Sequence, residues 1–331
     1  MTAVDLEKIR QPTPEDDYFG HHQRSDDPWW NESSWFGFMV PERKIDGYFY
    51  VWHRPNMNLI AGGIAVWDDV GTEHHNCLYS DWYNFSPPAA DNDMFHYRLT
   101  NGMSCELVEP LWEYRLRHDT PTCQVDLNWR GTEDPLNLHW EHEKAGYEVF
   151  GGFHYEQFGH ITGTIVVEGE TIDVDCHHIR DRSWGRRPFL PYMGRGGVDS
   201  GWSSPNTSFC TTMGLLKSET PLAQDIVEPL DYGQFKKDGV VGVVVDGQRR
   251  VTERYPDGRP KRLVLDMVDA AGRNFHAEGE VQNCLKWNDI WYCHWCLVKW
   301  DLNGEPGWGE TQDWVDKTLI RSHQRAALRS P

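Results

Sequence analysis

The chain has 331 residues, of which 39% are hydrophobic, and this length accommodates one large or two ordinary domains with a real core. Its 32 Lys and Arg against 51 Asp and Glu give a net charge of −19, which repels nucleic-acid phosphates and anionic membrane surfaces over most of the exterior. The composition predicts a folded globular protein without a nucleic-acid partner.

The opening residues, MTAVDLEKIRQPTPEDD, are polar and acidic and contain no apolar core. No later apolar run approaches the roughly 20 residues that a membrane helix needs. We therefore expect a cytoplasmic protein with no integral membrane segment, and a homodimer is left open as its assembly.

Strand-like segments follow one another along the first half of the chain. They are short, alternating or rich in aromatic residues, and separated by Pro, Gly, Asn and Asp, which is typical of an antiparallel meander. The predicted strands are residues 47–54, 62–68, 77–83, 94–100, 104–108, 112–118 and 123–129.

The second half repeats this pattern. Segments 239–245, 249–255, 262–268 and 275–281 are divided by Asp246-Gly247, Asp257-Gly258 and Ala271-Gly272, dipeptides that hairpin turns use. Another strand is predicted at 291–300, and short helices near 6–11, 221–228 and 318–328.

The domain organisation follows from these segments. The Pro- and Gly-rich stretch 187–199 is the weakest join in the chain. We predict a mostly β protein with an N-terminal segment (1–19), a first antiparallel β-barrel or sandwich domain (20–187), and a second one (188–331) that ends in a short helix.

No metal site is predicted. The eight cysteines are dispersed, so we expect free and mostly buried thiols. Cys293 and Cys296 form a CxxC, but strand alternation would point their sulfurs to opposite faces. His139 and His142 could ligate a metal on a helical turn, although exposed or hydrogen-bonded histidines explain them more simply.

The most informative stretch is residues 173–187, DVDCHHIRDRSWGRR. If residues 172–180 are extended, alternation gives one face with Asp173, Asp175, His177 and Ile179 and the other with Ile172, Val174, Cys176 and His178. A bend is predicted around Gly185, since glycine permits a turn that strains other residues.

Two interpretations of this stretch stay open. In the functional one, burial shifts the titratable groups toward acid–base catalysis. In the structural one, the stretch is a surface strand and a salt-bridged bend in which Asp181 pairs with Arg182 or Arg186, and Trp184 fills the core.

The chain also carries 17 Trp, 13 Tyr and 13 Phe. Rings that keep a polar group suit pockets for bulky apolar molecules, although a β-rich core could also be built from them. The candidate substrate-binding rings are Trp35, Tyr48, Tyr50, Trp52 and Trp202.

The sequence resembles the tandem lipocalin-like family that includes carotenoid 1,2-hydratases (hydroxyneurosporene synthases), AttH-like proteins and, more distantly, Diels-Alderases. The resemblance rests on residues 31–54 (NESSWFGFMVPERKIDGYFYVWHR), on the following AGGIAVWD, and on HHIRDRSWGRR at 177–187. It implies two lipocalin-like β domains, a hydrophobic small-molecule substrate in a pocket between them, and chemistry without a cofactor. The sequence agrees on the last point, because it has neither a GxGxxG in a βαβ setting nor a GxSxG.

A hydratase needs a proton donor, shielding of the resulting cation and a base for water. Asp181 is the candidate donor, His177 or His178 the candidate base, and Trp184 could stabilise positive charge. Arg182 opposes this assignment, because a neighbouring guanidinium holds Asp181 ionised.

Three functions therefore stay open. The first is a cofactor-independent hydratase, lyase or isomerase acting on a hydrophobic terpenoid, steroid or aromatic metabolite. The second is a noncatalytic lipocalin-like carrier of such a compound. The third is a pericyclase, which needs shape and desolvation rather than a general acid.

Overall fold

The computed structural model describes residues 10–18, 26–87, 93, 95–137, 153–188, 195–216, 222–288 and 291–329. The chain forms two compact units. Of the described residues, the N-terminal unit contains those within 10–68 and 74–188, and the C-terminal unit contains those within 69–73 and 195–329. Each is described by itself.

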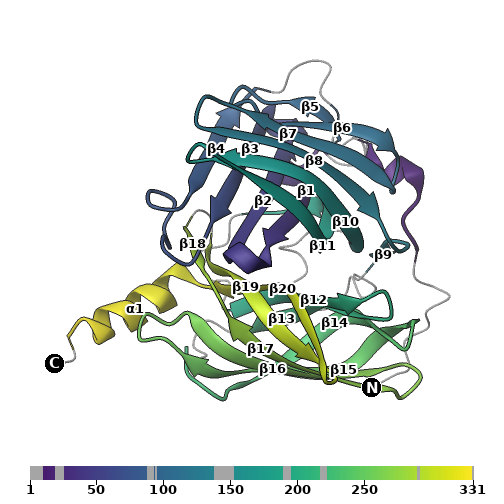
Figure 1. Cartoon of the computed structure of the whole chain (residues 1–331), viewed down its shortest axis with the longest axis vertical. Coiled ribbons are helices and arrows are strands. Elements are labelled where there is room, and N and C mark those ends of the chain that lie inside the picture. The colour runs from purple at the N-terminus through teal and green to yellow at the C-terminus, as the bar shows by residue number, and fades with distance from the viewer. Residues whose placement is uncertain are drawn as a thin grey trace. The chain divides into compact units, whose positions relative to one another are not determined.

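The N-terminal unit is one antiparallel sheet that curves into a half-barrel (Figure 1). Its strands lie in the order β4-β3-β2-β1-β11-β10-β8-β7-β6-β5, and β9 pairs with β10. The strands are β1 (Trp30–Val40), β2 (Ile45–Arg54), β3 (Leu59–Trp67), β4 (Tyr79–Ser86), β5 (His96–Arg98), β6 (Ser104–Glu109), β7 (Glu113–Asp119), β8 (Cys123–Gly131), β9 (Leu136–Asn137), β10 (Phe153–Val167) and β11 (Glu170–Arg186). Short 3-10 turns lie at η2 (Pro14–Asp17), η4 (Pro41–Arg43) and η5 (Pro55–Met57).

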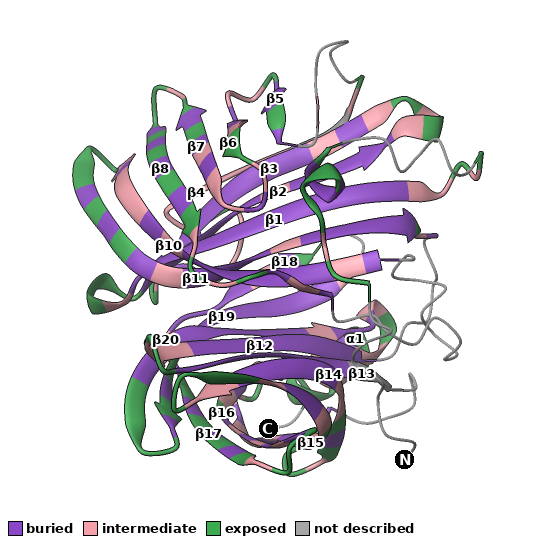
Figure 2. Ribbon diagram, turned by 90° about the vertical axis from the view of Figure 1, so that its right-hand side faces the viewer, coloured by how far each residue is buried: buried purple, intermediate pink, exposed green. Residues whose placement is uncertain are grey.

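Burial divides this sheet into two regions (Figure 2). In β8 every second residue is buried, as expected of a strand with one face toward a core and the other toward water. β1 is buried along nearly its whole length, and so is β2. Both faces of the sheet are therefore covered around β1 and β2, where aromatic residues are dense.

The C-terminal unit is a closed barrel (Figure 1). Its strand order is β17-β16-β15-β14-β13-β12-β20-β19-β18, and pairing of β17 with β19 closes a ring of eight strands outside which β18 lies. The elements are β12 (Arg195–Ser204), β13 (Thr207–Leu216), β14 (Val227–Lys237), β15 (Val240–Arg254), β16 (Pro260–Asp269), β17 (Asn274–Val281), β18 (Leu285–Asn288), β19 (Tyr292–Leu302), β20 (Glu305–Val315) and the helix α1 (Lys317–Ala327).

One part of this barrel contains fully buried ion pairs. Asp313 lies 3.0 Å from Arg195, 3.3 Å from Arg249 and 2.7 Å from Arg254. Glu228 pairs with Arg195 and Arg249, and Asp199 lies 2.9 Å from Arg249. Three guanidiniums thus face three carboxylates without solvent, so loss of any one would leave an uncompensated buried charge.

The prediction of a mostly β protein with two β domains and few helices is confirmed. The helix predicted at 318–328 corresponds to α1, whose first turn is capped by the Asp316 side chain accepting from Thr318 N–H and Leu319 N–H. Of the helix predicted at 6–11, only residues 10 and 11 lie in the described part, and they are not helical. The eight cysteines are free thiols, and all except the half-buried Cys77 are buried, as expected.

Three local predictions are wrong. Asp246-Gly247 makes no turn, because β15 continues through it with a register shift between Val244 and Asp246 that marks a bulge. Residues 222–226 are not helical, and β14 begins at Val227. The bend expected at Gly185 is absent, since β11 runs on to Arg186 with Gly185 at φ 136°. At Asp246-Gly247 and at Gly185, pairing with a neighbouring strand overrides the local turn signal.

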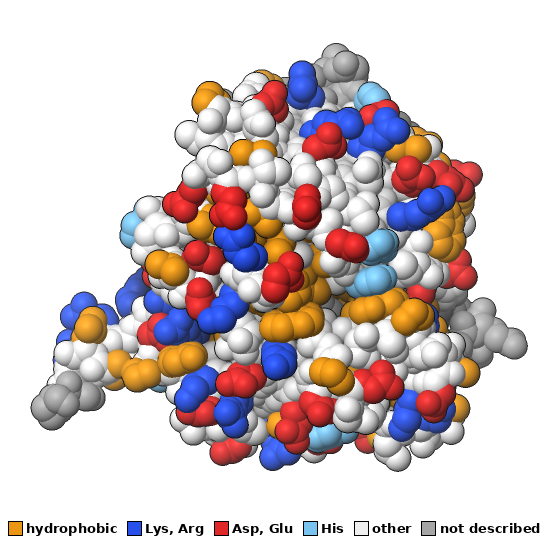
Figure 3. All heavy atoms as spheres, viewed as in Figure 1, with side chains coloured by type: hydrophobic (Ala, Val, Ile, Leu, Met, Phe, Trp, Pro, Cys, Tyr) orange, Lys and Arg blue, Asp and Glu red, His pale blue; other side chains and the backbone are white. Residues whose placement is uncertain are grey.

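No helix among the described residues is both long and apolar enough to cross a membrane. Acidic side chains are spread over the face drawn in Figure 3, with basic ones interspersed, in keeping with the net charge of −19.

Candidate functional site

Strand register brings Asp181 opposite Trp35 on β1 and Glu156 on β10. Trp35 in turn lies opposite Tyr50 on β2. Because residues directly across an antiparallel pair project from the same side of the sheet, these four side chains share one face, referred to here as the Asp181 face. Four strands that are far apart in sequence therefore assemble it.

Aromatic rings cover the Asp181 face beside this carboxyl. Tyr50 is in edge-to-face contact with Trp52 at 5.3 Å and Tyr48 at 6.4 Å between ring centroids. Trp82 of β4 lies 5.3 Å from Trp52 and 5.8 Å from Tyr50. Tyr50 and Trp82 are half-buried, so their rings keep accessible surface on which a planar or apolar molecule could pack. Trp35, Tyr48, Tyr50 and Trp52, all predicted ligand contacts, are thus brought together here.

Asp181 titrates far from its ordinary range. Burial is the main cause that raises its pKa, and the neighbouring Glu156 carboxyl also raises it, while His154, Arg187 and Arg182 lower it; the resulting pKa is about 6. A carboxyl with this pKa is partly protonated near neutral pH, so it can donate a proton and take it back.

Next to Asp181, β10 supplies a histidine–carboxylate pair. His154 Nε2 lies 3.2 Å from Glu156 Oε1, and their side chains are 14% and 2% exposed. Spaced two apart on one strand, both residues point to the Asp181 face, His154 opposite Ser183 and Glu156 opposite Asp181. A carboxylate that accepts from one ring nitrogen fixes the tautomer and the orientation of the imidazole, so that the other nitrogen is the one that can accept a proton.

The chain just after β11 adds a guanidinium. Arg187 donates from Nη2 to Ser183 Oγ at 3.0 Å and from Nη1 toward Ser33 Oγ at 3.4 Å. It interacts electrostatically with both Asp181 and Tyr50. Arg54 donates from Nη2 to the Arg187 carbonyl at 3.1 Å, and burial together with Arg187 lowers its pKa to about 10.

The neighbouring arginines of the motif lie on the opposite face of the sheet. Arg182 pairs with Glu32 at 2.6 Å, and Arg186 pairs with Asp27 at 2.7 Å. The expected pairing of Asp181 with either arginine is therefore not what the structure shows. Trp184 lies two residues after Arg182 and therefore on the same face as Arg182. It stacks on Phe153, with 4.3 Å between the ring centroids, instead of approaching Asp181.

Arg180 occupies a ring-lined position on that opposite face. Its guanidinium lies 4.6 Å from the Tyr114 ring centroid, 5.2 Å from that of Tyr155 and 5.3 Å from that of Trp129. Asp17 of η2 accepts from the Tyr155 hydroxyl at 2.6 Å and lies 3.3 Å from Arg180. These contacts fix β11 on the face opposite to Asp181, and they thereby limit the movement of the neighbouring Asp181.

The two motif histidines have different surroundings. His177 is half-buried and stacks on His160 at 4.7 Å, and His160 Nε2 lies 2.6 Å from Asp175 Oδ1. Burial and His160 lower the pKa of His177 to about 4. His178 lies beyond the last β1–β11 pair, with its ring 5.3 Å from Trp35 at 60°, and burial lowers its pKa to about 3.

The contact of His178 with β1 gives a stability prediction. A Cβ at Gly37 would lie 2.3 Å from His178 Cε1 and 2.4 Å from Trp35 Cη2, so both rings would have to shift. We expect Gly37→Ala to lower the free energy of unfolding in urea by about 1–3 kcal/mol. In a His178→Ala background the cost should shrink, and an equal cost in both backgrounds would contradict this contact.

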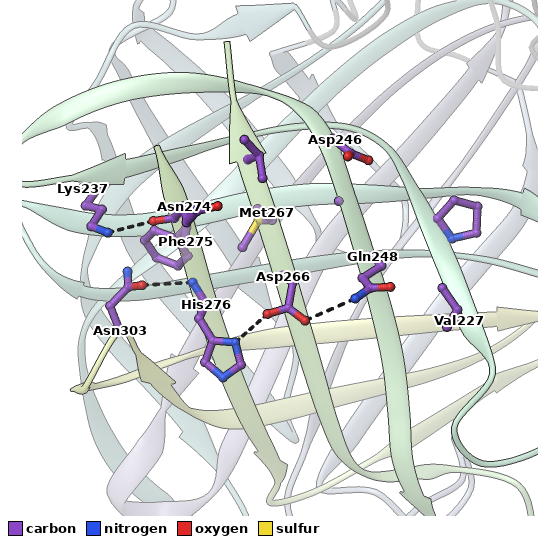
Figure 4. Close-up of a pocket in the computed structure, with 13 residues that line it drawn as sticks. Val227, Lys237, Asp246, Gln248, Asp266, Met267, Asn274, Phe275, His276 and Asn303 are labelled. Atoms are coloured by element: carbon purple, nitrogen blue, oxygen red, sulfur yellow. Dashed lines mark hydrogen bonds and ion pairs between the residues drawn. The ribbon is translucent and has the colours of Figure 1, made fainter. Parts of the chain in front are cut away.

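The C-terminal unit holds the remaining predicted ring and a groove. Trp202 is half-buried, with the Lys236 ammonium 5.9 Å from its ring centroid. A groove of about 620 Å³ lies along β14 to β17 (Figure 4). At this groove the His276 ring lies 2.7 Å from Asp266 and 3.2 Å from Glu278, so these three titratable groups pair with one another at the surface. The groove therefore offers less for acid–base chemistry than the Asp181 face.

Metal ligands do not gather in the described part of the chain, where no group of three or more His, Cys, Asp or Glu is placed to hold an ion. His139 and His142 lie outside the described residues. Cys293 and Cys296 are both buried in β19.

A family model described as "Domain of unknown function (DUF7064)" matches residues 13–316. The chain belongs to this family. No curated protein sequence matches it.

Solved structures share the fold of this family member over nearly its whole length. A protein of Nitrosomonas europaea assigned as an AttH is 14% identical, with a TM-score of 0.57 over 94% of this chain and 98% of that one. Kievitone hydratase from Nectria haematococca is 11% identical, with a TM-score of 0.55 over 95% and 96%. CghA, solved with Sch210972, is 12% identical, with a TM-score of 0.57 over 87% and 89%. The predicted resemblance to AttH-like proteins and hydratases is confirmed at the level of the fold.

Sequence reasoning missed part of this site. His154, Glu156 and Arg187 were not singled out, although Arg187 ends the motif itself. The sequence alone shows that His154 and Glu156 would lie on the same face of a strand, but only the β10–β11 register shows that they face Asp181.

Proposed function

We propose that this protein is a cofactor-independent enzyme of the hydratase or lyase kind, acting on a hydrophobic terpenoid, steroid or aromatic metabolite at the Asp181 face. The observation that carries this proposal is a carboxyl with a pKa raised to about 6 amid accessible aromatic rings. The rings of Tyr50, Trp52 and Trp82 would hold the substrate by packing and edge contacts.

Each polar group then has a defined task. In dehydration, Asp181 donates a proton to the departing hydroxyl group, and in hydration its carboxylate takes that proton from the attacking water. His154, oriented by Glu156, takes the proton from the substrate carbon in dehydration and returns it to that carbon in hydration. This assignment replaces His177 and His178 as the base, since burial keeps His178 neutral against Trp35 and His177 stacks on His160.

The solved relatives support the proposal without deciding the reaction. One of them is a hydratase, and its fold spans this chain almost completely. A carrier would use the same rings but would gain nothing from a carboxyl with a raised pKa beside a histidine–carboxylate pair. A pericyclase would need neither the carboxyl nor the histidine–carboxylate pair. The acid–base groups therefore favour hydration or dehydration.

The test begins with the small molecule that co-purifies with the protein, identified by mass spectrometry after denaturation. Wild type and Asp181→Asn are then incubated with that compound in ¹⁸O-labelled water. Hydration gives a product heavier by one labelled water, and dehydration gives one lighter by one water. Both changes should be lost in Asp181→Asn. An unchanged compound would identify a carrier, an isomer of equal mass without label would identify a pericyclase, and either result rejects the proposal.

A further inference from the structure

The Asp181 face has a cationic side, formed by Arg187 and Arg54 beside Tyr50. We propose that the substrate carries an oxygen that becomes negatively charged during the reaction, as in a β-hydroxy ketone and its enone or a conjugated phenol, and that Arg187 and Tyr50 receive this oxyanion. This inference rests on the proposed function and narrows its substrate class.

Arg187 is positioned for this task. The hydroxyls of Ser33 and Ser183 lie opposite each other across β1 and β11, 2.7 Å apart, and both accept from the Arg187 guanidinium. These contacts fix the plane of the guanidinium on the same side of the sheet as Asp181 and Tyr50. Burial raises the pKa of Tyr50 to about 12, so its hydroxyl stays protonated and can donate to an oxyanion.

The sign of the charge that develops in the reaction decides between two kinds of hydration. Protonation of an isolated alkene makes a carbocation, whereas addition to an enone passes through an enolate. One unit charge at about 5 Å from a guanidinium at an effective dielectric constant of 20 changes a rate on the order of 100-fold. Cation–π contact with one ring stabilises a carbocation by an amount that changes a rate about 30-fold. Two guanidiniums therefore favour the anionic route.

The strength of Asp181 as an acid also favours the anionic route. Burial, together with the Glu156 carboxyl opposite it on β10, raises the pKa of Asp181 and makes it a weaker acid than an ordinary aspartate. A weak acid protonates an enolate carbon or a departing hydroxyl readily but an isolated alkene poorly. The site therefore suits a conjugated substrate.

Dehydration of a β-hydroxy ketone proceeds in two steps. His154 takes the proton from the carbon next to the carbonyl, and the electron pair of that C–H bond forms the enolate, whose oxygen lies between Arg187 and Tyr50. The enolate then expels the β-hydroxyl: the C–O bond breaks, a C=C bond forms, and Asp181 supplies the proton that makes the leaving group water. The proton on His154 returns to Asp181 through solvent, and hydration is the same path reversed.

Binding of 4-nitrophenol and of nitrobenzene, measured by equilibrium dialysis at pH 8, tests the oxyanion site without turnover. The two rings are alike, but only the phenol ionises, and its phenolate is visible by absorbance. We expect wild type to bind 4-nitrophenolate at least 10-fold more tightly than nitrobenzene and to lower the pKa of the bound phenol by about one unit. Arg187→Gln should abolish this preference. Equal affinities in wild type, or a preference that survives Arg187→Gln, would overturn the inference.

Matched variants separate recognition from folding. Arg186→Gln removes the adjacent exposed arginine and should leave the preference unchanged. If Arg187→Gln does not fold, Arg187→Lys and Tyr50→Phe replace it, and each should reduce the preference about 3- to 10-fold; no reduction in either refutes the assignment. Labelled-water turnover without a phenolate preference would reject this inference alone. A phenolate preference without turnover would reject the proposed function and leave the anion site standing.

Discussion

Asp181→Asn should lower turnover by about 10²-fold or more while leaving ligand affinity within a few-fold. The amide keeps the size of the carboxyl but cannot donate and recover a proton. Wild-type turnover that depends on protonated Asp181 should fall as the pH rises above about 6, the pKa to which burial raises this group in the presence of Glu156, His154, Arg187 and Arg182. The measurement is kcat and KM for both proteins between pH 5 and 8.

The same substitution should stabilise the fold at high pH. The pKa of Asp181 in the folded protein, about 6, is above that of an ordinary aspartate, about 3.9, so the folded state binds a proton more tightly than the unfolded chain does. The cost of ionising Asp181 therefore builds up between pH 4 and 6 and is fully present at pH 8. We expect Asp181→Asn to add about 2 kcal/mol to the free energy of unfolding at pH 8 and almost nothing at pH 4.

Asp175→Asn is the matched control, because Asp175 lies on the same strand with a side chain that is 79% exposed. It should change neither turnover nor stability by much. A folded Asp181→Asn protein with full activity would remove this residue from the mechanism. A lower melting temperature at pH 8 would show instead that the carboxylate holds the structure together.

Asp313→Asn should have the largest effect on stability, lowering the free energy of unfolding by about 3–5 kcal/mol. Asp313 is fully buried and faces Arg195, Arg249 and Arg254 at 2.7–3.3 Å. Neutralising it leaves three guanidiniums against only Asp199 and Glu228. Urea denaturation at pH 7 gives the value, and Glu280→Gln is the control, because Glu280 is 55% exposed and lies 3.8 Å from Arg262.

The pH dependence of this effect has a defined sign. The arginines hold the pKa of Asp313 well below its usual range, so its contribution is fully present above about pH 4 and is lost as the pH falls further. Wild type should therefore lose more stability than Asp313→Asn between pH 5 and 3. Parallel curves for the two proteins would show that the carboxylate is not paired as described.

The sequence alone determined what depends on local pattern. Alternation at residues 172–178 predicted which side chains of β11 are buried, and Ile172, Val174, Cys176 and His178 are buried as expected. Short, ring-rich segments between turn residues predicted the β fold and the place of α1. These features follow from side-chain periodicity and turn chemistry, which a single segment carries within itself.

Only the tertiary structure decided which side chains meet. Arg182 pairs with Glu32, 150 residues away, and this frees Asp181 from the partner that its neighbours in sequence suggested. Glu156 faces Asp181 only because β10 and β11 pair in one register, and a shift of one residue would turn it to the other face. Register is set by the sum of contacts along β1, β2, β10 and β11, so the acid–base site depends on pairing between distant segments that no local pattern contains.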